Sequence, residues 1–294
     1  MKSETKKNPV QEPRLRDLEP ALGTLRTDVL AGLRSSPKYL PSQYLYDERG
    51  ALLFEKICEQ PEYYITRTEL SILEKNMDSI ADRIGSHALL IEPGSGDGMK
   101  SGLVLEGLNK PTGFVPIDIS RAQLVNVARA MANRFPAIEV APVCADFTDD
   151  PEVPEVSQPV RRRVAFFPGS TIGNLVPEGS LDVLRHLRTL CGERGFVLIG
   201  FDLKKDQKVL ESAYDDAAGV SGDFALNYLS RLNAELDANF DLDAFGYEAR
   251  YNQERGRIEM SVVSRRNQTV RLGNAEIEFE SGCLLYTSPS PRDS

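Results

Sequence analysis

The chain has 294 residues, of which 41% are hydrophobic and 27% are charged, and its formal net charge is −9. This composition is typical of a folded protein and excludes wholesale disorder. An acidic chain is a poor candidate for binding nucleic acid or anionic membranes, because the phosphate contacts that dominate such binding need Lys and Arg. We therefore expect a small-molecule substrate and neither a nucleic-acid nor a membrane partner.

The cysteines and histidines exclude further classes of protein. There are four cysteines and two histidines, and no CxxC pair occurs. This pattern predicts neither a metal site nor a disulfide framework, and it favours a reducing, cytoplasmic location. The N-terminal segment lacks the apolar core of a signal peptide, and no stretch approaches the roughly 20 apolar residues of a membrane helix.

The N-terminal part of the chain is expected to be irregular and then helical. Residues 1–17 are polar and charged, and we expect them to be disordered. The apolar spacing from 18 to 33 predicts a short helix, which a loop rich in Pro, Tyr and Ser follows. Two more helices are predicted at 50–58 and 66–84. We assign residues 18–65 to a substrate-binding lobe.

Short apolar runs then alternate with helical stretches. The runs have the length of buried strands and lie at 87–92, 113–118, 138–146, 163–169 and 195–202. The helical patterns between them lie at 100–108, 121–134 and 179–191. This alternation predicts βαβ units and an α/β fold with a parallel, doubly wound sheet over residues 66–205.

Beyond residue 205 the pattern changes again. Helices are predicted at 208–217 and 224–236, and antiparallel strands at 247–251, 257–264, 268–272 and 275–279. A strand meander outside a parallel sheet predicts a second, smaller α+β lobe. We assign residues 206–282 to this lobe and expect the Tyr-rich segment near the N-terminus to join it.

A glycine-rich loop follows the first predicted strand. The sequence from Glu92 to Gly98 is EPGSGDG, which carries Gly94 and Gly96 in its centre. Glycine lets the backbone come close to a ligand and adopt positive φ values. The first strand–helix junction is also the usual nucleotide site of such folds. The loop alone leaves a dinucleotide and S-adenosylmethionine open as ligands.

Two later acids favour an adenosine ligand. Asp118 ends the second predicted strand, 22 residues after Gly96, where a carboxylate can accept hydrogen bonds from ribose hydroxyls. Asp146 ends the third strand and precedes Phe147, so it could accept from the adenine amino group while Phe147 covers the ring. A row of acids closing the first three strands fits an adenosine, whereas a pyrophosphate needs no such row.

Longer motifs occur in order between Tyr44 and Met260. They are Tyr46-Asp47 with Gly50 and Leu53-Phe54, PEYYITRTE at 61–69, the loop at 92–100, FPGSTIGNL at 167–175, AYDDAAG at 213–219, NAELDANFDLDAF at 233–245 and RIEM at 257–260. In these motifs the chain resembles the histidine N-α-methyltransferases of the ergothioneine pathway, which make trimethylhistidine (hercynine) from histidine and three S-adenosylmethionine molecules. The resemblance implies a Rossmann-like class I methyltransferase domain with a smaller substrate lobe.

The resemblance also implies site residues. The implied cofactor contacts, in addition to the loop glycine Gly96, are Gly94, Lys100, Asp118, Asp146 and Phe147. The implied amino-acid contacts are Tyr46, Phe54, Tyr63, Gly169, Asn174, Tyr214 and Met260. Side-chain amides and tyrosine hydroxyls can bind an amino-acid head group, and aromatic faces can accompany a methylated cation. We take Tyr46, directly or through water, as the candidate proton acceptor from the α-amine.

The stretch 283–294 departs from the family. The resemblance implies that the family continues past the last strands with an acidic residue and a serine that bind the imidazole. Methyltransferases of this fold also have two further strands after the fifth, and nothing after Phe279 is long enough to supply them. We expect a foreign tail from about Cys283 and a sheet that exposes an unpaired edge and an apolar face, which favours aggregation. Little methylation activity is expected for this reason.

Three alternatives remain. The first is a related N-methyltransferase that acts on another amino acid, such as a tryptophan derivative. The second is a nicotinamide-dependent oxidoreductase, which the acid–Phe pair at 146–147 and the absence of a dehydrogenase-like catalytic histidine disfavour. The third is a catalytically inactive ligand-binding fragment. The presence of Tyr46, Tyr63, Asn174 and Tyr214 argues against it, while the departure of the C-terminal stretch from the family argues for it.

Overall fold

The computed structural model describes residues 12–18, 25–147, 151–175 and 177–288. The chain divides into two compact units, and the first comprises Met1–Pro20, Leu73–Phe167 and His186–Leu198. The second unit comprises Ala21–Ile72, Pro168–Arg185 and Ile199–Ser294. The segment Pro168–Arg185 thus clusters with the second unit, whereas the sequence placed it in the cofactor-binding domain.

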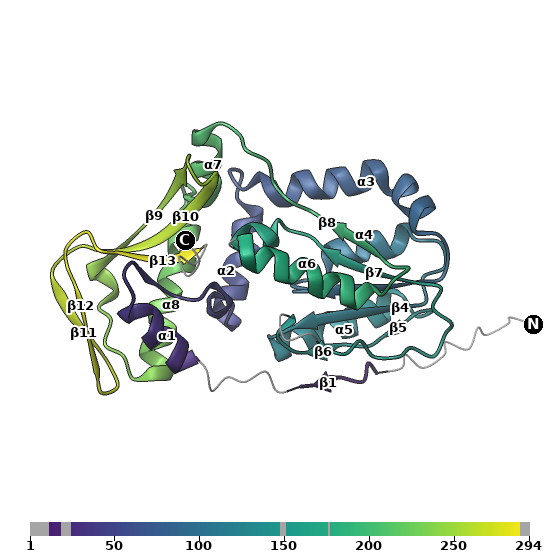
Figure 1. Cartoon of the computed structure of the whole chain (residues 1–294), viewed down its shortest axis with the longest axis horizontal. Helices are drawn as coiled ribbons and strands as arrows, with labels where there is room; N and C mark the ends of the chain where they lie inside the picture. Colours follow the sequence, from purple (N-terminus) through teal and green to yellow (C-terminus); the bar gives the residue numbers. More distant parts are fainter. Residues whose placement is uncertain (1–11, 19–24, 148–150, 176, 289–294) are drawn as a thin grey trace, which may run out of the picture. The chain divides into compact units, whose positions relative to one another are not determined.

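A parallel sheet forms the centre of the first unit (Figure 1). Its strand order is β1-β6-β4-β3-β7-β8, and β5 pairs with β4. The strands are β1 (Arg16–Asp17), β3 (Ala88–Pro93), β4 (Gly113–Asp118), β5 (Glu139–Val140), β6 (Val143–Cys144), β7 (Arg162–Phe167) and β8 (Phe196–Ile199). The predicted doubly wound parallel sheet is confirmed, and the third predicted strand is divided between β5 and β6.

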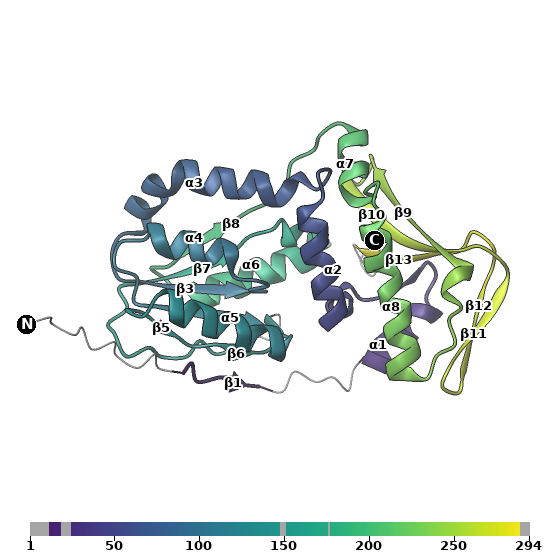
Figure 2. The same cartoon turned by 180° about the vertical axis from the view of Figure 1, so that it is seen from behind.

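The helices that follow the strands cover both faces of this sheet. They are α4 (Met99–Gly107), α5 (Arg121–Arg134) and α6 (Pro177–Cys191). The chain runs in one direction across the sheet from β3 through β4 to β6, and in the other direction from β7 to β8. Right-handed crossovers therefore place α4 and α5 on one face and the end of α6 on the other (Figures 1 and 2). The strand residues between them, such as Leu90, Phe114 and Phe166, are buried in the core.

The two outer strands of this sheet differ from the rest. Arg16 and Asp17 pair in parallel with Val143 and Cys144, so the expectation of disorder up to residue 17 is wrong for these two residues. Residues 1–11 lie outside the described part of the chain. At the other edge, β8 has Phe196 and Val197 exposed at 41% and 39%. Among the described residues β8 is thus the last strand on this side of the sheet, and it carries two exposed apolar side chains.

The second unit combines helices with a mixed four-stranded sheet and an antiparallel two-stranded sheet. The larger sheet has the order β2-β13-β10-β9, and the smaller one pairs β11 with β12. The strands are β2 (Lys38–Tyr39), β9 (Phe245–Asn252), β10 (Arg257–Ser264), β11 (Gln268–Leu272), β12 (Ala275–Phe279) and β13 (Leu284–Ser288). The helices are α1 (Leu25–Arg34), α2 (Glu48–Glu59), α7 (Gln207–Tyr214) and α8 (Val220–Leu236), while α3 (Tyr64–Ile84) runs from this unit into the first.

The structure corrects two predictions for this unit. The first helix begins at Leu25 and Leu18 lies outside it, while residues 19–24 are not described. The tail was expected to lie outside the domain, but Leu284–Ser288 form β13, which pairs antiparallel with β10 and parallel with β2. Leu285 is fully buried there, because it joins the core of this unit. Residues 289–294 fall outside the described part of the chain.

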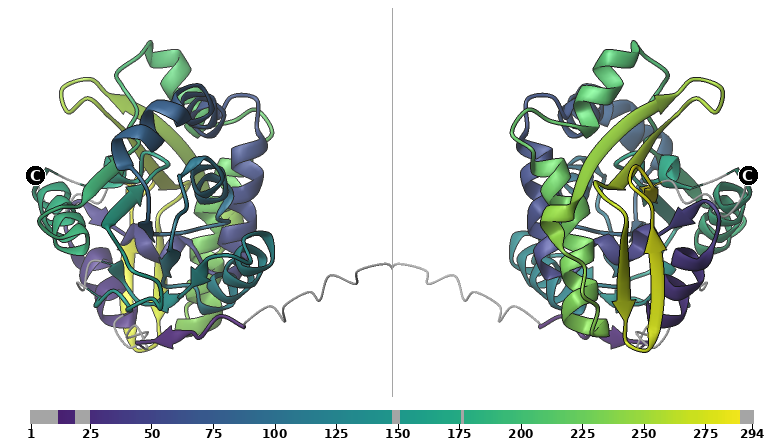
Figure 3. Two further views of the ribbon diagram at one scale, coloured as in Figure 1. Left: turned by 90° about the vertical axis from the view of Figure 1, so that its right-hand side faces the viewer. Right: turned by 90° about the vertical axis from the view of Figure 1, so that its left-hand side faces the viewer.

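The core of the second unit forms between α8, α2 and the strands. Helix α8 packs on β9 and β10, as Figure 3 shows, and its face toward the core carries Phe224, Tyr228 and Leu232. Helix α2 begins after Asp47, whose carboxylate accepts from the Gly50 amide at 2.7 Å and so caps the helix. The predicted joining of the N-terminal Tyr-rich segment to this lobe is confirmed, since Tyr44 and Leu45 belong to the same core.

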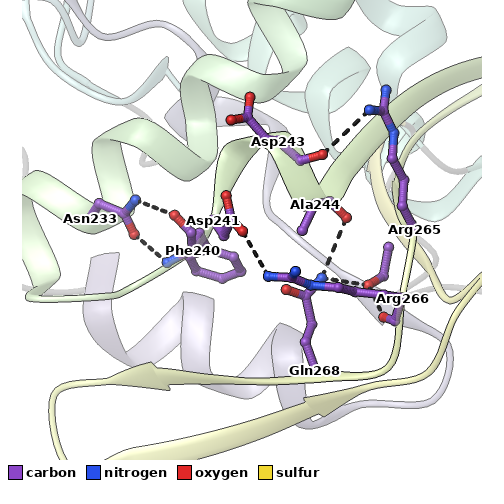
Figure 4. A network of polar contacts seen from close by, with 9 residues as sticks. Asn233, Phe240, Asp241, Asp243, Ala244, Arg265, Arg266 and Gln268 are labelled. Atoms are coloured by element: carbon purple, nitrogen blue, oxygen red, sulfur yellow. Dashed lines mark hydrogen bonds and ion pairs between the residues drawn. The ribbon is translucent and has the colours of Figure 1, made fainter.

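One motif that carries the family resemblance has a structural role. In the stretch 233–245, the Asn233 side chain donates to the Phe240 carbonyl at 2.8 Å and accepts from the Phe240 amide at 2.7 Å (Figure 4). Arg266 forms an ion pair with Asp241 in the same loop. The two Asn233 bonds satisfy the amide and the carbonyl of Phe240, which helix and sheet leave free, and so fix the turn between α8 and β9.

No helix among the described residues has both the length and the apolar character that crossing a membrane requires.

Candidate functional site

The glycine loop after β3 is a tight turn anchored to the neighbouring strand. The amides of Gly94 and Ser95 both donate to the Ile117 carbonyl, at 2.8 and 3.2 Å. Gly98 begins α4 with a φ of 71°, and a Cβ there would lie 2.7 Å from Met131 Cε. Only glycine fits this close approach of α4 to α5, so the loop and the helix start are fixed together.

Acidic residues follow three adjacent strands of the sheet. Glu92 lies near the end of β3, Asp118 ends β4, and Asp146 comes two residues after β6. Because the strands are parallel neighbours, these residues lie side by side at the carboxyl ends of the strands. The row of acids predicted from the sequence is therefore present in the first unit.

Glu92 is a buried carboxyl group that is uncharged near neutral pH. Burial raises its pKa from 4.5 to about 8, against the lowering effects of the Ser101 hydrogen bond and the Lys100 charge. Ser101 Oγ lies 2.6 Å from Glu92 Oε2. A neutral carboxyl here supports the base of the glycine loop without placing a buried charge beneath it.

Asp118 organises the loop from the next strand. Its carboxylate accepts from the Gly96 amide at 3.3 Å and from the Ser120 amide at 2.9 Å. Burial raises its pKa, while these backbone hydrogen bonds oppose the rise. The carboxylate thus reaches from the end of β4 to the centre of the glycine loop, where a ligand's hydroxyl groups could share it.

The second unit brings together four of the seven predicted amino-acid contacts. The rings of Tyr46 and Phe54 meet edge to face with centroids 5.5 Å apart, and Phe54 lies 6.2 Å from Tyr63. Tyr63 in turn lies 5.9 Å from Tyr214. Phe224 of α8, which sequence reasoning missed, completes this aromatic cluster, because its ring lies 5.4 Å from that of Tyr46. Only its apolar position on a predicted helix pointed to it.

Two tyrosines of this aromatic cluster, Tyr63 and Tyr214, remain protonated at neutral pH. Burial holds the pKa of Tyr63 well above its ordinary value, and the charge interactions with Tyr214 and other neighbours add to the rise. Burial also raises the pKa of Tyr214 to about 12, to which Asp202 contributes. Both side chains therefore act as hydroxyl donors and not as bases.

The loop after β7 holds two further predicted residues. Asn174 ends the 3-10 helix η4 (Thr171–Asn174), which Gly169 and Ser170 precede with φ values of 80° and 56°. The Gly169 amide donates to both carboxylate oxygens of Glu69 on α3, at 3.0 and 2.9 Å. Glu69 belongs to the motif at 61–69, yet the sequence offers no sign of its partner, which is 100 residues away.

Two further predicted residues, Met260 and Lys100, lie on regular secondary structure. Met260 is buried on β10, and Lys100 is the second residue of α4. Among the described residues, no group of three or more His, Cys, Asp or Glu side chains could hold a metal ion.

The parallel sheet, the glycine loop and the acids behind its strands define a Rossmann-like methyltransferase of class I. The family model described as histidine-specific, S-adenosylmethionine-dependent methyltransferase matches residues 25–292. The chain belongs to this family, and it is an S-adenosylmethionine-dependent methyltransferase. The match includes the residues after Cys283.

Several curated proteins are similar to the chain. Histidine N-alpha-methyltransferase of Mycolicibacterium smegmatis is 39% identical over 276 residues, which cover 92% of this chain and 84% of that protein. The protein of the same name from Mycobacterium tuberculosis is 37% identical over 272 residues, covering 90% and 83%. Ergothioneine biosynthesis protein 1 of Schizosaccharomyces pombe is 28% identical over 266 residues, covering 87% of this chain and 34% of that protein.

The first unit offers polar groups that fit the cofactor of this family. Ser95 Oγ is buried and has no hydrogen-bond partner among the described residues. Apart from Gly96 and its two chain neighbours, no atom lies within 4 Å of the place where a Cβ of Gly96 would stand, so this part of the loop faces open space. The ring of Phe147 lies 5.7 Å from that of Phe167, edge to face, at the end of the same sheet. Together with Asp118, these groups suit an adenosine with its polar sugar and flat base.

Proposed function

We propose that this protein methylates the α-amino nitrogen of L-histidine three times, giving N-alpha-trimethylhistidine (hercynine) in ergothioneine biosynthesis. The similarity to proteins named histidine N-alpha-methyltransferase supports this substrate. The observation that carries the proposal is the aromatic cluster of Tyr46, Phe54, Tyr63, Tyr214 and Phe224, because such a cluster suits a substrate that becomes a permanent cation.

We assign the cofactor to the first unit. Asp118 accepts hydrogen bonds from the ribose hydroxyls, and Asp146 accepts from the adenine amino group while Phe147 covers the base. Gly94, Gly96 and Lys100 contact the rest of the cofactor along the loop and the start of α4. S-adenosylmethionine supplies an electrophilic methyl group on a positively charged sulfur.

We assign the amino acid to the second unit. The hydroxyls of Tyr63 and Tyr214 donate to the substrate carboxylate, since both remain protonated. Asn174 holds the amine or carboxylate from the loop that also carries Gly169. Phe54 and Met260 provide apolar contacts to the remainder of the substrate.

The reaction is a displacement in which the nitrogen lone pair forms the N–C bond as the C–S bond breaks. The ammonium group must first lose a proton, for which Tyr46, directly or through water, is the proposed acceptor. Alignment of nitrogen with the methyl carbon contributes most of the acceleration, and such alignment can supply roughly 7–11 kcal/mol.

Mass spectrometry of the products tests this proposal. The purified chain is incubated with S-adenosylmethionine and, separately, with histidine, tryptophan and other amino acids. Because Leu284–Ser288 form β13 inside the second unit and the family match extends past Cys283, we now expect an active chain. Histidine should gain three methyl groups, all on the α-nitrogen as fragment ions locate them. Asn174→Ala should lose this activity, while Asn109→Ala, an exposed asparagine of the first unit, should retain it. Methylation of the imidazole, or of another amino acid in preference to histidine, would contradict the proposal.

A further inference from the structure

The carboxylate of Glu69 has an unusual position beside two backbone segments. It accepts the Gly169 amide hydrogen with both oxygens, at 3.0 and 2.9 Å. It also lies against Gly200, where a Cβ would come within 1.7 Å of Glu69 Oε1. Any side chain at position 200 would therefore displace the carboxylate from the Gly169 amide.

The loop that Glu69 holds has a backbone that few sequences adopt unaided. Gly169 and Ser170 are consecutive residues with φ values of 80° and 56°, and a left-handed serine costs free energy. Such a conformation persists only where its surroundings fix it. Thr171 Oγ1 donates to the Pro168 carbonyl at 2.9 Å, and the Gly173 amide donates to the Ser170 carbonyl at 2.8 Å.

A second attachment reaches the same loop from the chain after β8. The Asp202 amide donates to Ser170 Oγ at 3.0 Å, and the Asp202 carboxylate accepts from the Tyr64 hydroxyl on α3. The first two turns of α3 thus hold the loop twice, through Glu69 directly and through Tyr64 by way of Asp202. The loop ends at Asn174.

We propose that Glu69 is a positioning residue. Its carboxylate fixes the Gly169–Asn174 loop in the conformation that presents Asn174 to the amino-acid head group. Position 200 is glycine so that the Glu69 carboxylate can reach this loop. The inference rests on the proposed assignment of Asn174 to the substrate. Glu69 touches neither reacting atom in this account and acts through the loop backbone. A charge-assisted hydrogen bond is stronger than a neutral one, which suits a carboxylate for this task.

The direct test is hydrogen exchange of the ligand-free protein. In Glu69→Ala the Gly169 amide loses its acceptor, so exchange in a peptide covering residues 168–175 should be about tenfold faster or more, while a peptide from β10 stays unchanged. Gly200→Ala should give the same local change with Glu69 still present. Unchanged exchange at 168–175 in both variants would overturn the proposal, as would equal acceleration throughout the chain in both.

Kinetics supply the functional test. Glu69→Ala and Gly200→Ala should raise KM for histidine about tenfold or more, with S-adenosylhomocysteine affinity within about twofold of the wild type. Glu69→Gln keeps an oxygen acceptor and should recover most of the loss. Glu74→Gln, an exposed position on the same helix, serves as the matched control. An equal loss of cofactor affinity, or a normal KM in Glu69→Ala, would refute the positioning role.

The two proposals fail in different ways. If the wild-type chain prefers another amino acid, the histidine assignment is wrong, and the same ratio of KM values is measured with the preferred substrate. If the wild type methylates histidine and Glu69→Ala does so with equal KM, the proposed function stands and the role of Glu69 is refuted.

Discussion

Replacing Glu92 with glutamine should remove a pH dependence of stability that the buried carboxyl creates. The pKa of Glu92 rises from 4.5 in water to about 8 in the folded protein, chiefly through burial. The folded state therefore binds this proton more tightly than the unfolded state does. The stabilisation is complete below pH 4.5 and is lost as the pH rises through 8.

The magnitude follows from the size of the shift. At about 1.4 kcal/mol per pKa unit, the shift corresponds to about 5 kcal/mol, of which about 4 kcal/mol falls between pH 5 and pH 9. Glutamine keeps the shape and an oxygen that accepts from Ser101 Oγ, but it cannot ionise. Glu92→Gln should thus match the wild type near pH 5 and exceed its free energy of unfolding by about 4 kcal/mol at pH 9.

Urea unfolding followed by circular dichroism at pH 5, 7 and 9 measures this difference. Asp118 has a raised pKa as well, and Lys100 and Asp97 interact with Glu92, so the wild-type profile contains their contributions. The difference between wild type and Glu92→Gln isolates the buried carboxyl, and Glu74→Gln provides an exposed control. Parallel profiles for wild type and Glu92→Gln would refute the reasoning, since they would mean that Glu92 ionises normally.

Three further outcomes are expected. In titration calorimetry the protein should bind S-adenosylhomocysteine and give no heat with NAD. Asp118→Ala should weaken S-adenosylhomocysteine binding by roughly 1.5–3 kcal/mol for each charged hydrogen bond lost, and unchanged affinity would contradict the ribose assignment. Asn174→Ala and Tyr63→Phe should cripple histidine methylation in a radiolabel assay but leave cofactor affinity nearly unchanged, and lost cofactor binding in a folded variant would show that the site is wrongly divided. Val197→Lys should reduce aggregation in light scattering, because a charge on the exposed edge strand β8 opposes pairing between copies, and an equal tendency to aggregate would show that this edge is not responsible.

The sequence predicted long and periodic elements well and short ones poorly. The bounds expected for the strands at 257–264, 268–272 and 275–279 are those of β10, β11 and β12. The strand β1 has only two residues, and it exists because Arg16 and Leu18 donate to the carbonyls of Pro142 and Cys144. Hydrogen bonds between segments so far apart in the chain leave no periodic signal in either one.

The site likewise contains some features that the sequence predicted and others that it did not. The acids at 118 and 146 were predictable because each follows an apolar run that reads as a strand. The neutral state of Glu92 was not, because it depends on complete burial. The bond between Glu69 and Gly169 was equally hidden, since it needs both the left-handed loop and the space left by Gly200.

The protonated tyrosines bear on how the proposed reaction would handle its protons. Tyr63 and Tyr214 are poor bases at neutral pH, so removing a proton from the substrate falls to Tyr46 or to water. The three transfers need a neutral primary, a neutral secondary and a neutral tertiary amine in turn, so each waits for a proton to leave. The third methyl group then completes a quaternary ammonium that carries no proton. From then on the charge is permanent, and aromatic faces can accompany it without any exchange of protons. A proton acceptor is therefore needed before each transfer but never after the last, which explains why the proposed site combines one candidate acceptor with several hydroxyl donors and aromatic rings.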